Sequence, residues 1–305
     1  NQLEFLKKKY KIELVLLAIP SLSIEEKTKI LSRIQHLNIN VRTLPDLNEL
    51  TSGKIDISYV RDLNINELLG RQQISIKSLS SNTKIIKANV LITGGGGSIG
   101  SEICRQISQL NPKKIIIVEL NEFSLYSIQQ EIEEIIQDKK IKVIPKLASI
   151  LDEDIMDKIF NEHRPDIIFH AAAYKHVKLV EDNPITSLEN NVFGTLKVAK
   201  LSSKYFVRNF ILISSDKAVR PTNIMGASKR LSELIIQALQ AENTGTIFSI
   251  VRFGNVLGSS GSVVPKFLDQ IKLGGPITLT DEKVTRFFMT INEAVSLVIK
   301  ASLIA

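Results

Sequence analysis

The fold is decided by Thr93-Gly94-Gly95-Gly96-Gly97-Ser98-Ile99-Gly100, which follows an apolar run and opens a segment with helical character. Glycines at 94, 97 and 100 permit a tight turn, a close approach of the backbone to a pyrophosphate, and close packing of a helix on a strand. Backbone N–H groups at the helix N-terminus would bind the anion. A glycine-rich turn without a ligand is the alternative, but the strand before and the helix after favour a dinucleotide. We expect the cofactor contacts to come from Thr93, Gly94, Gly97, Ser98, Ile99 and Gly100.

A regular alternation of strands and helices surrounds this loop. Segments with apolar residues at helical spacing, such as Glu122–Gln137 and Leu188–Tyr205, separate short runs rich in β-branched residues. This alternation predicts an α/β fold with a doubly wound parallel sheet whose strands are buried on both faces. The six expected strands are Ala88–Thr93, Lys114–Glu119, Ile141–Pro145, Asp166–His170, Asn209–Ser214 and Thr246–Arg252.

The first 84 residues predict a smaller unit. Ile12–Pro20 and Val41–Pro45 indicate strands, and residues 23–37 indicate a helix with a serine cap and acidic first turn. This β-α-β arrangement is too short for a complete sheet, and the polar stretch 51–84 is typical of a connecting arm. We therefore expect a partial Rossmann-like domain with its arm over residues 1–84, and an NAD-binding catalytic domain with substrate-binding loops over residues 85–305.

Composition excludes several classes of protein. The 305 residues are 44% hydrophobic and 23% charged, which is typical of a globular protein. Lys and Arg number 39 against 32 Asp and Glu, a surplus that suits an anionic small molecule or a membrane face. With no tryptophan and few aromatic residues, we expect no nucleic-acid partner. The 4 histidines and 1 cysteine show no metal-ligand spacing, so we expect no metal.

The ends of the sequence suggest a longer parent protein. The first residue is Asn1 rather than Met, and no apolar run approaches the roughly 20 residues that span a bilayer. We expect a fragment, with any membrane contact made through segments absent from this chain.

Glu119 ends the second strand of the series, 19 residues after Gly100. A carboxylate at this point accepts hydrogen bonds from adenosine ribose hydroxyls and repels a 2′-phosphate, which favours NAD over NADP. Asn121 can share this role. The alternative is a solvated glutamate at a strand end.

Four motifs in order carry a family resemblance: Thr93–Gly100, His170-Ala171-Ala172-Ala173-Tyr174-Lys175-His176-Val177, Ser214-Ser215-Asp216-Lys217-Ala218-Val219, and Asn223-Ile224-Met225-Gly226-Ala227-Ser228-Lys229-Arg230. With them the chain resembles the extended short-chain dehydrogenase/reductases, and among these the long, membrane-anchored UDP-N-acetylglucosamine 4,6-dehydratases of bacterial polysaccharide and glycan biosynthesis. The resemblance implies NAD, a UDP-sugar substrate, a homo-oligomer, and a site on the cytoplasmic side of an inner membrane that anchors the full-length protein. It also implies that the C-terminal substrate-binding stretch is cut short at Ala305.

One departure from the parent superfamily sharpens this match. The usual catalytic tyrosine is replaced by Met225, four residues before Lys229. A thioether cannot give or take a proton, so Met225 is no general base. The long dehydratases are similar in carrying methionine here, although a dead enzyme would show the same change. By family analogy, Lys229 binds the nicotinamide ribose.

The resemblance implies oxidation at sugar C4, elimination of water across C5–C6, and hydride return to C6. By similarity to the family's Thr/Ser-Asp-Glu/Lys element (here Ser215, Asp216 and Lys217), Asp216 would protonate the leaving C6 hydroxyl and Lys217 would take the C5 proton. We hypothesise that Asp216 first accepts the C4 hydroxyl proton. The alternative is a structural salt bridge at a strand end.

Further residues are expected around the ligands. Ala171 and Ala172 should line the cofactor site, and Lys175 is the best substrate-side candidate of its loop. The family resemblance assigns Asn255 to the sugar nucleotide. Side chains that suit a nucleotide diphosphate follow, with hydroxyl groups on Ser259 and Ser260 and cationic groups on Lys266 and Arg286. Taken without the upstream motifs, this loop is typical of an ordinary surface turn.

Two other functions remain open. One is a nucleotide-sugar epimerase of the same superfamily, but such enzymes generally need a tyrosine base at the position that Met225 occupies. A non-catalytic NAD-binding scaffold would keep the glycine loop but would not need Asp216 with Lys217.

Overall fold

The computed structural model describes residues 84–304 except 138, 139, 243, 244, 260, 280 and 282, together with residues 7, 9–10, 12, 14–17, 19, 26, 30, 40–43 and 61–62. The chain divides into two compact units, residues 1–73 and 74–305. Each unit is described by itself.

The first unit contains a small sheet. Strand β1 (Leu14–Leu17) pairs in parallel with β2 (Asn40–Thr43), so both predicted strands are confirmed. The helix predicted over 23–37 falls almost entirely outside the described residues. Strand β3 (Arg61–Asp62) pairs antiparallel with β2, so the interpretation of residues 51–84 as a connecting arm alone was incomplete. The strand was missed because Arg61 and Asp62 are polar and form no apolar run. It is defined only by its pairing with the edge of β2.

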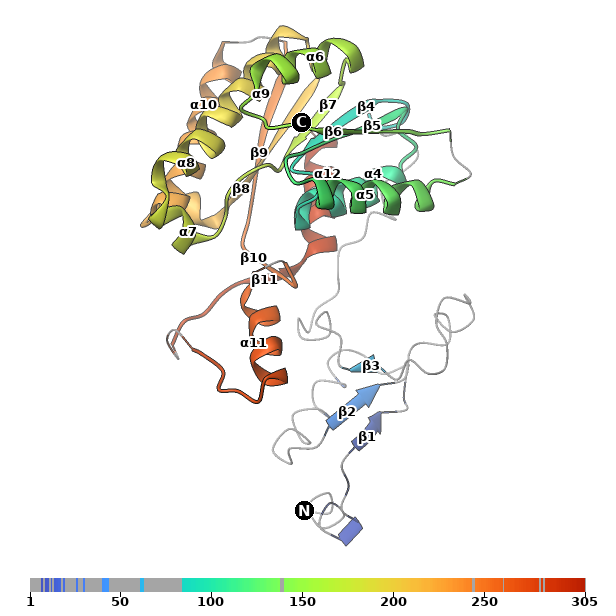
Figure 1. The fold of residues 1–305 in the computed structure, drawn as a ribbon, viewed down its shortest axis with the longest axis vertical. Helices are drawn as coiled ribbons and strands as arrows, with labels where there is room; N and C mark the ends of the chain where they lie inside the picture. The colour runs from blue at the N-terminus through green and yellow to red at the C-terminus, as the bar shows by residue number, and fades with distance from the viewer. Residues whose placement is uncertain are drawn as a thin grey trace. The chain divides into compact units, whose positions relative to one another are not determined.

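The second unit is built on a fully parallel six-stranded sheet with the order β6-β5-β4-β7-β8-β9 (Figure 1). The chain winds outward in one direction from β4 to β6 and in the other from β7 to β9. The carboxyl ends of β4 and β7 therefore form the switch point at which doubly wound sheets bind ligands. All six predicted strands are confirmed: β4 (Asn89–Thr93), β5 (Lys114–Glu119), β6 (Lys142–Leu147), β7 (Ile167–His170), β8 (Asn209–Ser215) and β9 (Ile247–Phe253).

Helices cover both faces of this sheet (Figure 1). Helices α4 (Ser98–Ser108), α5 (Glu122–Ile135) and α12 (Ile291–Ile304) bury one core, which includes Ile92 and Val298. On the other face lie α6 (Glu153–His163), α9 (Gly194–Lys204) and α10 (Ile224–Ala241), whose core includes Leu91 and Phe210. Neighbouring residues of β4 thus point to opposite cores, as the pleat of a strand requires.

The helix predicted over Leu188–Tyr205 is divided. Helix α8 (Pro184–Leu188) ends in a π-helical turn, η3 (Glu189–Phe193), before α9 begins. Asn191 in this turn is buried; its Oδ1 accepts from the N–H of Tyr174 at 2.8 Å, and its Nδ2 donates to the Tyr174 carbonyl at 3.0 Å. The wide turn therefore fastens the loop after β7, whose next helix is α7 (Val177–Asp182).

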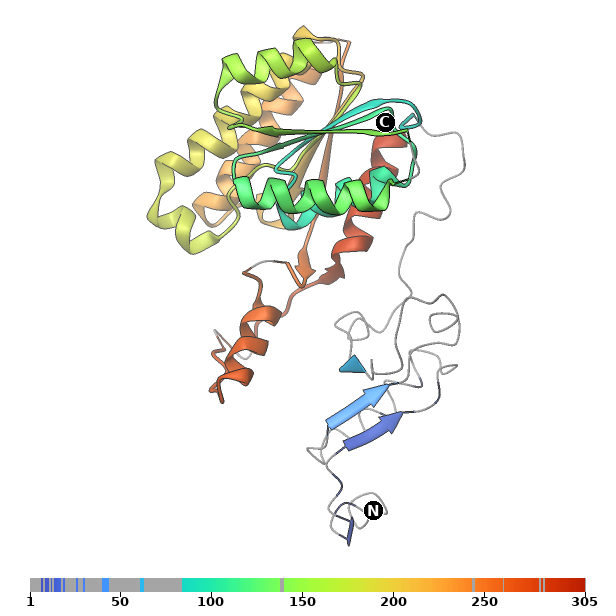
Figure 2. The ribbon, with the colours of Figure 1, turned by 45° about the vertical axis from the view of Figure 1, so that its right-hand side comes forward.

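The last part of the unit extends beyond the sheet. Strands β10 (Asn255–Leu257) and β11 (Phe288–Thr290) form a separate parallel pair, and α11 (Val263–Lys272) lies between them in the chain. Figure 2 shows α11 away from the main sheet, whereas α12 returns to pack beside α4. Strand β10 follows β9 directly after Gly254, and Phe253 at the end of β9 pairs with Ser215 at the end of β8, so β10 begins beside the carboxyl end of β8.

Candidate dinucleotide and substrate site

A cleft runs along the carboxyl ends of the central strands. It consists of three adjoining cavities of about 520, 440 and 390 Å³, and Ala171, Ala173 and Lys175 line all three. We call the 520 Å³ cavity the glycine-loop cavity, because Gly94, Gly97 and Ser98 line it together with Glu119. We call the 390 Å³ cavity the lysine cavity, because Lys217 and Lys229 also line it.

Only glycine fits two positions of the loop after β4. Gly94 has a positive φ of 66°, and a Cβ there would lie 2.7 Å from the backbone of Ala172. A Cβ on Gly100 would lie 2.0 Å from the carbonyl oxygen of Gly94. The sequence prediction that these glycines allow a tight turn and close helix packing is therefore confirmed.

The start of α4 fits an anionic ligand. Gly97 caps this helix without a side-chain hydrogen bond, whereas the side chains of Asn121 and Asp152 cap α5 and α6. The positive end of the α4 dipole consequently faces the glycine-loop cavity with no side-chain cap. The residues present fit the pyrophosphate of a dinucleotide.

Glu119 and Asn121 both line the glycine-loop cavity. The Glu119 carboxylate accepts from the N–H groups of Gly96 at 2.9 Å, Leu120 at 2.9 Å and Asn121 at 3.0 Å. A carboxylate has about four acceptor positions, so these three hydrogen bonds leave one position that can accept from a ribose hydroxyl. The Asn121 Oδ1 accepts from Ser124 N–H, so this oxygen serves the α5 cap.

Thr93 lies beneath the loop rather than in the cleft. It is fully buried, and its hydroxyl is 2.8 Å from Nδ1 of His170, whose Nε2 is 3.0 Å from the hydroxyl of Thr195. Burial, with a smaller contribution from the charge of Lys229, lowers the pKa of His170 to about 3. His170 is therefore a neutral clamp between β4 and α9, which sequence reasoning missed although a histidine closes that apolar strand.

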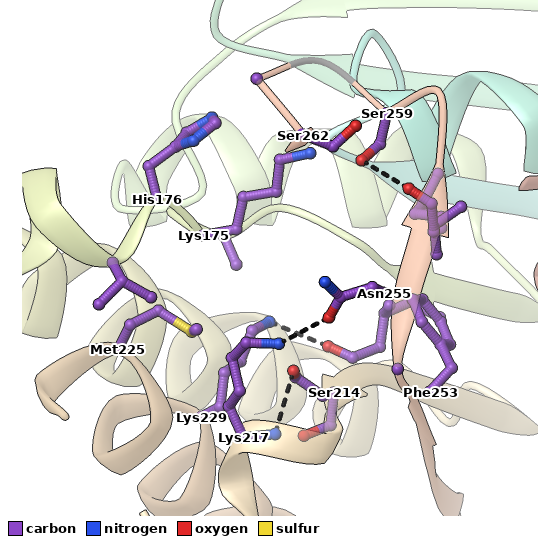
Figure 3. Close-up of a pocket in the computed structure, with 18 of the residues that line it drawn as sticks. Lys175, His176, Ser214, Lys217, Met225, Lys229, Phe253, Asn255, Ser259 and Ser262 are labelled. Carbon is purple, nitrogen blue, oxygen red and sulfur yellow. Dashed lines mark hydrogen bonds between the residues drawn. The ribbon is translucent and has the colours of Figure 1, made fainter. Parts of the chain in front are cut away.

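The lysine cavity brings together most predicted reaction residues (Figure 3). The buried Lys229 donates from Nζ to the Ile213 carbonyl at 2.9 Å, and burial lowers its pKa to about 8 against the opposing charge of Glu233. Met225 lies in the same cavity and is 3% exposed, so the position of the superfamily tyrosine is buried and apolar. Other predicted residues that line this cavity are Ile99, Ala171, Lys175, Ser215, Asn255 and Ser259.

The acid–amine couple lies at the edge of this cavity. Lys217 lines it, and its Nζ is 3.1 Å from Asn255 Oδ1 (Figure 3). The same Nζ is 3.0 Å from Asp216 Oδ1. Asp216 is not among the residues lining the three cavities; its side chain is 46% exposed and also accepts from Ser215 Oγ at 3.0 Å. The structure thus places the amine inside the cleft and the carboxylate at its rim.

The predicted diphosphate contacts are only partly assembled. Lys266 and Arg286 do not line the three cavities, and the Arg286 guanidinium donates to the Thr285 carbonyl at 2.8 Å. Ser260 lies outside the described residues. Lys175 lines all three cavities, and burial lowers its pKa.

Two absences apply to the described part of the chain. It holds no group of three or more potential metal ligands. None of its helices combines the length and apolar character of a membrane span.

The fold and the glycine-loop site define a Rossmann-type α/β protein with a doubly wound parallel sheet. Residues 90–305 match the family described as "Polysaccharide biosynthesis protein", and the chain belongs to this family. Capsular polysaccharide biosynthesis protein CapD of Staphylococcus aureus is 40% identical over 298 residues, covering 98% of this chain and 50% of the relative. Probable polysaccharide biosynthesis protein EpsC of Bacillus subtilis (strain 168) is 42% identical, covering 97% and 49%. The chain thus spans about half the length of these curated relatives.

Solved structures share the architecture. The X-ray structure of Pen from Bacillus thuringiensis has a TM-score of 0.68 and 36% identity, covering 72% of this chain and 67% of that chain. The dTDP-glucose 4,6-dehydratase DesIV from Streptomyces venezuelae, solved with NAD and TYD bound, has a TM-score of 0.60 at 20% identity, covering 69% and 70%. The second likeness shows the fold alone.

Proposed function

We propose that this chain is the catalytic part of an NAD-dependent UDP-N-acetyl-hexosamine 4,6-dehydratase, with UDP-N-acetylglucosamine as substrate, in bacterial polysaccharide biosynthesis. The observation that carries the proposal is the joint placement of Lys217, Met225 and Lys229 in one cavity. An amine that can transfer a proton lines this cavity, and methionine stands where a simple oxidoreductase or epimerase of the short-chain dehydrogenase/reductase class has its tyrosine.

Several features support NAD as the cofactor. The glycine loop and the α4 N-terminus would hold the pyrophosphate, Glu119 would accept from the adenosine ribose, and Lys229 would donate to the nicotinamide ribose. Bound NAD would supply the hydride acceptor and donor. The carboxylate of Glu119 disfavours the 2′-phosphate of NADP.

Proton transfer falls to the acid–amine couple. Asp216 takes the C4 hydroxyl proton and later delivers it to the C6 hydroxyl, which leaves as water. Lys217, as a neutral amine, takes the C5 proton, and the new C5–C6 double bond replaces the C5–H and C6–O bonds. Asn255 holds the Lys217 amine toward the cavity. The Lys217 amine lies 3.0 Å from the Asp216 carboxylate, so the two groups proposed to move protons are adjacent.

Binding of the sugar nucleotide must bring Asp216 into contact with the substrate, because its side chain is at the rim. We propose that the whole protein is membrane-anchored and oligomeric.

The test is to incubate the purified chain with NAD⁺ and UDP-N-acetylglucosamine and to follow the sugar by NMR and mass spectrometry. A 4-keto-6-deoxy product supports the proposal. A C4 epimer with no loss of water would identify an epimerase instead. Bound NAD with an unchanged sugar, in the presence of an active relative as positive control, would favour a non-catalytic scaffold.

A further inference from the structure

Glu233 is a buried carboxylate with no direct place in the proposed chemistry. It lies on α10 with 0% exposure. Its Oε1 accepts from Ser214 Oγ at 2.6 Å and from Arg252 Nε at 2.6 Å. Its Oε2 accepts from Arg252 Nη2 and from Arg230 Nη1 at 3.0 Å. Every acceptor direction of the carboxylate is therefore used within the protein.

These partners join three elements at one level of the sheet. Ser214 on β8 and Arg252 on β9 are direct partners in the strand register. Glu233 reaches both from the helix that covers them. One turn earlier on the same helix, Lys229 donates to the Ile213 carbonyl at 2.9 Å. Residues 213 and 214 are thus held to α10 by two successive hydrogen bonds, and Ser215, Asp216 and Lys217 follow directly.

The electrostatics point the same way. Burial alone raises the pKa of Glu233, but hydrogen bonds from Arg252, Ser214 and Arg230 outweigh it and lower the pKa to about 2. The carboxylate is therefore charged at any working pH. Its two arginines are partly exposed, with side chains 38% and 37% accessible, whereas Lys229 is enclosed. Solvent consequently screens the arginine charges more than it screens the Glu233–Lys229 interaction.

We infer that Glu233 is a positioning residue of the site: it fastens the end of β8 that carries Ser215, Asp216 and Lys217, and it lies one helical turn from Lys229. The negative charge of Glu233 also opposes the lowering of the Lys229 pKa by burial. A carboxylate serving packing alone would be costly here, since an apolar side chain of similar volume fills a core without desolvating a charge. The inference rests on the proposed function only for the roles of the residues it positions.

The charge effect is measured on the cofactor-free protein. Competitive acetylation at graded pH, followed by mass spectrometry of the Lys229 peptide, gives the pH at which this amine becomes reactive. The midpoint should lie near 8 in the native chain. His170 and Glu233 interact electrostatically with Lys229, and Lys175, His176 and Lys217 line the same cavity. The neighbouring charges are Arg230 and Arg252, which bind Glu233, and Asp216, which binds Lys217.

Glu233→Gln keeps the shape and removes the charge, so the Lys229 midpoint should fall by about one pH unit. Arg230→Gln removes a partly exposed positive charge from the same carboxylate, and the midpoint should rise. Glu242→Gln, which changes an exposed glutamate just after α10, should leave it unchanged. If Glu233→Gln does not fold, the opposite-signed shift of Arg230→Gln still tests the charge effect.

The hydrogen-bonded link from Glu233 to the end of β8 is tested separately by Ser214→Ala, which removes one hydrogen bond and no charge. Turnover should fall about tenfold with the Lys229 midpoint unchanged. An unmoved midpoint in both Glu233→Gln and Arg230→Gln, with loss of thermal stability only, would reduce Glu233 to a structural residue and overturn the inference. Because the labelling needs neither NAD nor sugar, this outcome is independent of whether the chain proves to be a dehydratase.

Discussion

Lys217 donates from Nζ to Oδ1 of Asn255 at 3.1 Å, which joins the segment after β8 to strand β10 across 38 residues of chain. The same amine is 3.0 Å from Asp216. The ammonium is therefore held between a carboxylate at the rim and an amide that lines the lysine cavity. This geometry presents Lys217 to a ligand in the cleft, and it leads to the first two predictions.

Lys217→Met should lower kcat by about 10²–10⁴-fold while NAD binding changes little, because a positioned acid–base group contributes on that order. The measurement is steady-state turnover with UDP-N-acetylglucosamine, together with NAD⁺ titration. Lys200→Met, an exposed lysine on α9, is the matched control. Equal turnover in the Lys217 variant and the native chain would remove this residue from the proposed proton path.

Asn255→Ala should lower kcat by roughly tenfold, the effect of losing about 1.4 kcal/mol of transition-state positioning. The effect should vanish when Lys217 is already methionine, because the two changes then remove the same interaction. A full tenfold loss in both backgrounds would show that Asn255 acts on the substrate directly rather than through Lys217.

Met225→Leu should retain native turnover within about threefold, because a buried apolar side chain of similar volume is replaced and no proton donor is lost. Thermal unfolding should show a cost below about 1.5 kcal/mol. A large fall in kcat with the fold intact would mean that the thioether has a specific role, which the cavity geometry does not assign to it.

His170 should make stability depend on pH. Its folded-state pKa of about 3 is below the value of 6.5 for a free histidine, so the unfolded chain binds a proton first as pH falls. His170 therefore has no effect on the pH dependence of the free energy of unfolding above pH 6.5. Between about pH 6.5 and 3 it lowers that free energy progressively, by at most about 1.4 kcal/mol per pH unit.

Chemical denaturation at pH 7 and pH 4.5 measures this dependence. His170→Gln should lose stability at pH 7, because the hydrogen bonds to Thr93 and Thr195 are disturbed, and should show a smaller further loss at pH 4.5 than the native chain. The exposed His176→Gln is the control. The same acid sensitivity in all three proteins would exclude His170 as its source.

Local patterns were sufficient for the sheet and the glycine loop. Six parallel strands were predictable because each is a short apolar run, and Gly94 and Gly100 because their steric requirement lies within a few residues of sequence. The helix over 188–205 was predicted as continuous, since nothing in its periodicity marks the π-helical turn. That turn depends on hydrogen bonds from Asn191 to Tyr174, which lies 17 residues away.

Candidate site residues divide in the same way. The sequence by itself determined which chemistry is available: the glycine loop, the methionine in place of tyrosine, and the adjacent acid and amine. Only the tertiary structure decided that Lys217 faces the cleft while Asp216 lies at its rim, that Lys266 and Arg286 stay outside the three cavities, and that Glu233 joins Ser214 to Arg252. The physical reason is that burial, charge compensation and side-chain direction depend on contacts between residues far apart in the chain, which spacing along the sequence does not encode.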